Sequence, residues 1–138
     1  MTDTITIHRL NPVDSAGTPA QEGVGETADG FRFLTLEPTA TLTPAGTYEL
    51  AVRPMASHGP ALRVEIVGFD DGERFFHSIN RAVESRGCTG VGDDRPIPGL
   101  LTGGISHHVA DKLAEIVSDA IARDGKAYAT YYPIPEAA

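Results

Sequence analysis

One cysteine, Cys88, stands alone in a chain of 138 residues, and this scarcity removes several classes of site. A single thiol cannot form an intrachain disulfide, and it cannot supply a multi-cysteine zinc or iron–sulfur centre. Three roles remain for Cys88: a small buried side chain, a thiol linked to a partner chain, or a reactive thiol.

Other absences narrow the class of protein further. No apolar run approaches the about 20 residues that a membrane-spanning helix needs, and residues 1–4 lack the basic and apolar stretches of a secretory signal. Basic residues are few, with 11 Lys and Arg against 19 Asp and Glu, which gives a net charge of −8. Such a surface repels phosphate backbones and anionic lipids, so we expect no nucleic-acid or membrane partner.

Apolar residues make up 41% of the chain, which is enough for a packed core in a single domain of this length. One apolar face over residues 109–121 predicts a helix, with Ser106 as its N-cap, Arg123 in its last turn and Gly125 just after it. Alternating apolar residues predict strands at residues 4–10, 31–36, 47–53 and 62–66, and an aromatic strand or tail at 128–132. The expected fold class is therefore mainly β, an α+β domain with one main helix.

Residues 11–30 contain no aromatic side chain and many Gly, Pro, Ala, Ser and Thr residues. This composition predicts a long loop or arm, either a flexible linker or a segment that a partner orders. We therefore divide the chain into residues 1–30, an N-terminal strand with an extended arm, and residues 31–138, a single domain.

The segment between residues 75 and 92 carries the best candidate for chemistry. His77 ends an apolar strand, and Cys88 follows eleven residues later, between glycines. A lone cysteine is more often a small buried side chain, but a neighbouring imidazole can accept the thiol proton and give a thiolate nucleophile. Arg86 would lower the pKa of the Cys88 thiol, and the backbone N–H groups of Gly87 and Cys88 would form an oxyanion hole.

This segment resembles the active-site segment of the L,D-transpeptidase (YkuD-like) fold, in which a His ends a strand and a Ser-His-Gly-Cys loop follows. Residues 85–88, Ser-Arg-Gly-Cys, stand in that place, and residues 43–48, Thr-Pro-Ala-Gly-Thr-Tyr, match an upstream turn of the family. The spacing is closest to a family of small uncharacterised phage and bacterial domains with a His-x-x-Asn … Gly-Cys motif. The residues that fit this pattern are His77, Asn80, Glu84, Ser85, Gly87, Cys88, Val91 and Gly92, with Leu36 and Glu37 ahead of the turn.

The resemblance implies an L,D-transpeptidase-like β-sheet domain that performs cysteine acyl transfer or hydrolysis on peptidoglycan peptides, in association with a phage. Cys88 would attack a carbonyl carbon, His77 would take and return the proton, and the amides at Gly87 and Cys88 would hold the oxyanion. Asn80 and Ser85 would orient His77 or the loop. No cofactor is implied.

Departures from the family pattern favour a second hypothesis, a catalytically silent virion component such as a decoration, neck or tail protein. Arg86 replaces the family histidine, and no arginine follows Cys88 until Arg95. The partners would then be neighbouring virion chains, in a homo-oligomer or a larger assembly, instead of a peptidoglycan peptide. The location implied is a phage virion or the bacterial cytoplasm. A third hypothesis is a plain β domain with a buried cysteine, whereas the first requires a surface-accessible Cys88.

No metal site is expected. His107 and His108 are adjacent at the predicted helix start and lie about 100° apart around a helix, so they cannot easily face one ion. The pairs at residues 70–71 and 93–94 are both Asp-Asp, but they lack the spacing of a calcium loop and are predicted to be turn residues.

Overall fold

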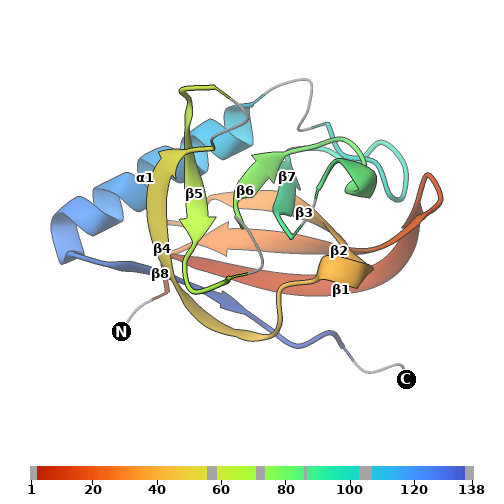
Figure 1. Ribbon diagram of the computed structural model, residues 1–138, viewed down its shortest axis with the longest axis horizontal. Coiled ribbons are helices and arrows are strands. Elements are labelled where there is room, and N and C mark those ends of the chain that lie inside the picture. Colours follow the sequence, from red (N-terminus) through yellow and green to blue (C-terminus); the bar gives the residue numbers. More distant parts are fainter. Residues whose placement is uncertain (1–2, 56–58, 71–73, 86, 103–106, 136–138) are drawn as a thin grey trace.

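The computed structural model describes residues 3–55, 59–70, 74–85, 87–102 and 107–135 (Figure 1). The described residues form one eight-stranded sheet with the strand order β5-β4-β8-β1-β2-β3-β7-β6, together with one α-helix. The expected mainly β fold with one main helix is confirmed. The elements are β1 (Ile5–Ser15), β2 (Thr18–Thr27), β3 (Arg32–Pro38), η1 (Thr39–Thr41), β4 (Gly46–Pro54), β5 (Leu62–Ile66), β6 (Phe76–Ser78), η2 (Ala82–Glu84), β7 (Thr89–Gly92), α1 (His108–Asp124) and β8 (Ala127–Tyr131).

The sheet curls until its two edge strands, β5 and β6, approach one another. Glu65 on β5 forms an antiparallel bridge with Phe75, the residue before β6. Beside it the Ile66 N–H donates to the Arg74 carbonyl at 2.8 Å. The sheet is therefore nearly closed, and alternate residues of each strand face its interior.

Helix α1 packs against β4, β5 and β8 and also reaches β6 and β7 (Figure 1). Its buried face, which includes Val109, Leu113 and Val117, joins the main core with inward residues of the sheet. Gly125 closes the helix with a φ of 85°, as the sequence predicts, because a left-handed residue there costs glycine little. The helix begins after His107, and Ser106 lies outside the described residues.

The expected loop or arm at residues 11–30 is wrong. Most of it belongs to a long hairpin of β1 and β2, paired from Ile5↔Thr27 to Ser15↔Thr18. The hairpin turns at Ala16 and Gly17, whose φ values are 51° and 93°, both in the left-handed region that two-residue hairpin turns use. β2 also pairs with β3, so both strands of the hairpin lie inside the same sheet as the segment that follows.

The sequence pattern did not predict this hairpin because β2 carries small residues where side chains of β3 fill the space. A Cβ built on Gly25 would lie 2.1 Å from the Phe33 ring, and one on Gly23 would lie 2.6 Å from the Thr35 hydroxyl. The inward positions of β2 therefore carry no large apolar side chain, and the strand lacks the alternation that predicts one.

Among the strands that the structure describes, two pairs are parallel and the others are antiparallel. β1 runs parallel to β8, with Ile5 opposite Ala129. β6 runs parallel to β7, with His77 opposite Gly90. This second pair carries His77, and Cys88 immediately precedes β7.

Candidate functional site

The pairing of β6 with β7 brings His77 and Cys88 to one region of the sheet. The Thr89 N–H donates to the Phe75 carbonyl at 2.9 Å, which places Cys88 beside Phe75 on the neighbouring strand. The side chains of Phe75 and Cys88 pack together, and His77 is two residues further along than Phe75. Because residues two apart share a face of a strand, His77 and Cys88 lie on the same face.

The environment of the thiol differs from the sequence expectation. Cys88 is only 8% exposed and packs with Met55 and Phe75. The expected surface-accessible thiol is therefore wrong, because Cys88 is buried in one cluster with Met55, from the segment after β4, and with Phe75. Nothing in the sequence around Cys88 indicates this contact.

The turn before Cys88 is fixed by hydrogen bonds and by glycine geometry. Ser85 Oγ donates to the Cys88 carbonyl at 2.6 Å and is itself buried, so this hydroxyl braces the turn before Cys88. Gly87 has a φ of 75°, a left-handed conformation in which a side chain would be strained. A Cβ at Gly87 would also lie 3.4 Å from the Arg74 guanidinium carbon.

The backbone amide of Gly87 is not directed at an incoming carbonyl. It donates to Thr41 Oγ1 at 3.1 Å, so the expectation that this N–H forms part of an oxyanion hole is wrong. The physical reason is the segment between β3 and β4, which passes beside the turn and places a hydroxyl acceptor there. Thr41 was not among the predicted site residues.

Arg74 is a second residue that the sequence did not reveal. Its side chain is buried at 6% exposure, with the guanidinium carbon 4.3 Å from the centre of the Phe69 ring. Nη1 donates to the Thr41 carbonyl at 2.9 Å, to Thr43 Oγ1 at 3.2 Å and to the Gly87 carbonyl at 3.4 Å. Arg86, expected to supply positive charge, lies outside the described residues, whereas Arg74 places a guanidinium directly against the turn.

Asn80 lies in the connection between β6 and η2. Its backbone N–H donates to Glu84 Oε1 at 3.3 Å, and its carbonyl accepts from the Leu101 N–H at 2.8 Å. Asn80 and Glu84 thus belong to one closed turn after β6. A role for Asn80 in orienting His77 stays a prediction.

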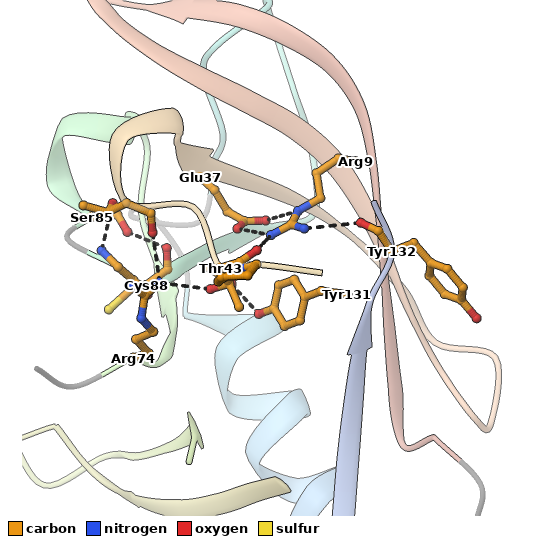
Figure 2. A network of polar contacts seen from close by, with 12 residues as sticks. Arg9, Glu37, Thr43, Arg74, Ser85, Cys88, Tyr131 and Tyr132 are labelled. Atoms are coloured by element: carbon orange, nitrogen blue, oxygen red, sulfur yellow. Dashed lines mark hydrogen bonds and ion pairs between the residues drawn. The ribbon is translucent and has the colours of Figure 1, made fainter. Parts of the chain in front are cut away.

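A buried polar network extends from this turn into the interior of the sheet (Figure 2). Arg74 donates to the Thr43 hydroxyl, and the Thr43 carbonyl accepts from Arg9 Nη2 at 2.6 Å. Arg9 in turn forms a two-pronged ion pair with Glu37. In Figure 2 the Cys88 sulfur points away from Arg9 and Glu37, so the network supports the backbone of the turn and leaves the thiol on the other side.

Tyr131 contacts the buried network from the interior of the sheet, through Thr89 and Arg9. Its hydroxyl shares a 2.5 Å hydrogen bond with Thr89 Oγ1, and the Arg9 guanidinium lies 4.7 Å from the centre of its ring. Complete burial raises the pKa of the Tyr131 phenol well above its ordinary value, and the nearby Glu37 carboxylate acts in the same direction. Tyr131 therefore stays neutral.

The remaining candidates behave as turn or helix-end residues. Asp93 accepts from the Thr102 hydroxyl at 2.8 Å, and Asp94 accepts from the Arg95 N–H at 2.8 Å. Asp70 lies in a bend, and Asp71 lies outside the described residues. Among the residues that the structure describes, no three His, Cys, Asp or Glu side chains are grouped so that they could hold a metal ion.

Comparisons with known proteins give no match to a family model, to a curated protein or to a solved structure. In the described part of the chain, α1 is too short and too polar to cross a membrane.

Proposed function

We propose that the chain is a cysteine acyl-transfer or hydrolytic domain in which Cys88 is the nucleophile and His77 is the base. The observation that supports this proposal is the parallel pairing of β6 with β7, which brings Cys88, the residue before β7, beside the strand that carries His77. The bracing of the Cys88 carbonyl by Ser85 supports it, because a nucleophile on a fixed turn needs little reorganisation in the reaction.

In the proposed reaction, His77 accepts the Cys88 proton and the sulfur attacks a carbonyl carbon. The tetrahedral intermediate collapses, and His77 returns the proton to the leaving amine. Ser85 keeps the turn in place, and Asn80 is proposed to orient His77 from the turn that follows β6. The cluster of Met55, Phe75 and Cys88 must open for a substrate to reach the sulfur, because Cys88 is buried in it.

The substrate class rests on the resemblance of residues 75–92 to the L,D-transpeptidase-like fold, which suggests peptides of peptidoglycan and a phage-associated protein. The net charge of −8 gives no long-range attraction to an anionic cell wall. Recognition would therefore depend on short-range contacts beside Cys88, or on the assembly that carries the domain.

The test is the pH dependence of Cys88 alkylation by iodoacetamide, because only the thiolate reacts. An activated thiol has a rate midpoint below the about pH 8.5 of a free cysteine, and His77→Asn should move the midpoint toward that value. His108→Asn is the matched control, since His108 begins α1 on another part of the chain. A wild-type midpoint at or above that of a free thiol would contradict the proposal.

A second assay asks about the substrate directly. Stem peptides and cross-linked peptides released from peptidoglycan are incubated with wild-type protein and with Cys88→Ala, and the products are identified by mass spectrometry. Cleavage or exchange that depends on Cys88 supports the proposed substrate class.

The second candidate function is a catalytically silent virion component, a decoration, neck or tail protein. The 8% exposure of Cys88 and the engagement of the Gly87 amide by Thr41 favour it, because both features suit a structural turn. Light scattering on the purified chain distinguishes the two candidates. A stable assembly that Cys88→Ala leaves intact supports the structural role, and a monomer with an activated thiol supports the enzyme.

A further inference from the structure

We propose that Thr41 is a catalytic residue of this site. Its hydroxyl donates the hydrogen bond that stabilises the oxyanion during acyl transfer to Cys88. The inference rests on the proposed function of Cys88. The starting observation is the hydrogen bond from the Gly87 N–H to the Thr41 hydroxyl. This bond engages the Gly87 amide, and the Thr41 hydroxyl is the polar group beside it.

The direction of this hydrogen bond decides which proton is available. Gly87 N–H is the donor and Thr41 Oγ1 is the acceptor, at 3.1 Å. A threonine hydroxyl has one proton of its own to donate, and within the described part of the chain no acceptor receives it. The Thr41 hydroxyl therefore offers a donor next to Gly87, the residue that immediately precedes Cys88.

Thr41 is accessible although its backbone is fixed. Its residue is exposed, and it ends the short helix η1 (Thr39–Thr41), in which the Leu42 N–H donates to the Thr39 carbonyl. Arg74 Nη1 holds the Thr41 carbonyl at 2.9 Å and also reaches the Gly87 carbonyl at 3.4 Å. One buried guanidinium thus links the residue that carries the hydroxyl to the turn that carries the nucleophile.

This arrangement suits an oxyanion donor for two reasons. A donor that is already in position stabilises developing charge without reorganisation in the transition state. A hydroxyl that accepts a hydrogen bond is also polarised and becomes a stronger donor. The Gly87 N–H would then act on the oxyanion through Thr41 instead of directly.

In the acylation step, the Cys88 thiolate forms a C–S bond with the carbonyl carbon, and the π electron pair moves to the carbonyl oxygen. The Thr41 O–H donates to that oxygen while it is negatively charged and keeps its own proton. When the C=O bond re-forms, the leaving group departs with the bonding electron pair. An amine leaving group takes its proton from His77, and p-nitrophenolate leaves without one.

The experiment compares two reactions of the same thiol in the full chain. Acylation by p-nitrophenyl acetate passes through an oxyanion, whereas alkylation by iodoacetamide is a direct displacement that forms none. Rates are measured for wild type, Thr41→Val and Thr41→Ser, with Cys88→Ala subtracted for other nucleophiles. Thr39→Val is the matched control, because Thr39 is also exposed and lies in the same short helix.

We expect Thr41→Val to lower the acylation rate by about 100- to 1,000-fold while the alkylation rate stays close to wild type. Thr41→Ser should restore acylation, and Thr39→Val should change neither reaction. An unchanged ratio of the two rates in Thr41→Val overturns the role of Thr41 and leaves the proposed function standing. An equal fall in both rates also overturns it, since that result means a displaced turn.

Failure of the proposed function gives a different result. In that case the wild-type protein is acylated no faster than the Cys88→Ala variant, or Cys88 is acylated no faster than a free thiol. Either result also overturns the role of Thr41. The wild-type measurement therefore tests the site, and the Thr41 variants test the donor.

Discussion

Arg9 and Glu37 face one another across the inside of the sheet in a two-pronged ion pair, with Nε–Oε1 at 3.0 Å and Nη2–Oε2 at 2.8 Å. Their side chains are 1% and 2% exposed. Arg9 also donates to the carbonyls of Thr43 and Tyr132, so its charge is almost fully solvated by protein oxygens. The pair connects β1 with β3, and Arg9 also contacts the segment between η1 and β4 through the Thr43 carbonyl. Thr43 in turn contacts Arg74, which donates to the Gly87 carbonyl in the turn before Cys88.

Removing one partner of this pair leaves a buried charge without its counter-ion. Arg9→Met and Glu37→Gln are each expected to lower the free energy of unfolding by about 3–5 kcal/mol, measured by urea denaturation at pH 7. The double variant should cost less than the sum of the two, because it leaves neither charge uncompensated. If each single variant lowers the free energy of unfolding by less than about 1 kcal/mol, the pair behaves like a solvent-exposed salt bridge and this prediction is wrong.

Met55 shares a buried cluster with Cys88. Met55→Ala is expected to accelerate alkylation of Cys88 by iodoacetamide, since it removes a large side chain from the cluster that buries the thiol. The same change should cost about 2–5 kcal/mol of stability, as for other buried methionines. Leu62→Ala, at a residue that is 50% exposed, is the control for nonspecific loosening. An alkylation rate equal to that of wild type would mean that reagents reach the sulfur from another side.

Ser85 holds the carbonyl of Cys88 and is expected to matter for stability. Ser85→Ala leaves that buried carbonyl without its donor, which should cost about 1–3 kcal/mol in urea denaturation. Ser118→Ala, at a half-buried serine on α1, provides the comparison. If acyl transfer is present, Ser85→Ala should slow it more than it slows alkylation, because the turn loses its fixed geometry. Equal stabilities for the two serine variants would contradict the role of Ser85.

Tyr131 makes stability depend on alkaline pH. Its pKa is raised by burial, so above about pH 10 the unfolded chain loses the phenolic proton while the folded chain keeps it. Ionisation then favours the unfolded state, and stability falls as pH rises beyond that point. Tyr131→Phe should be less stable at pH 8, where it lacks the bond to Thr89, but should lose less stability between pH 9 and 11.

The measurement is urea denaturation across that pH range, with Tyr132→Phe as the control because Tyr132 is 40% exposed. A parallel decline in wild type and Tyr131→Phe would show that other groups cause the alkaline loss.

Large apolar side chains at regular spacing made part of the fold predictable. Leu50 and Val64 lie on β4 and β5, where alternation predicts them, and Leu113 and Val117 lie on the buried face of the predicted helix. The hairpin of β1 and β2 escaped prediction because Gly23 and Gly25 leave room for side chains of β3. Alternation of apolar and polar residues appears in a sequence only where the strand's own large side chains fill the core.

The candidate site divides in the same way. Cys88, His77 and Ser85 were found from their order along the chain, which short strands and a turn convert into proximity. Arg74 and Thr41 were not found, because their roles come from contacts between segments far apart in sequence. The burial of Cys88 in a cluster with Met55 and Phe75 has the same origin.

The parallel pairing of β1 with β8, from Ile5↔Ala129 to Ile7↔Tyr131, has a consequence for the order in which the chain folds. β8 is made more than a hundred residues after β1, so this pairing closes only after nearly the whole described chain has left the ribosome. Contacts of such large sequence separation slow folding. Until β8 arrives, one edge of β1 is exposed and open to pairing with strands of other chains, which makes nascent copies of this protein prone to aggregation.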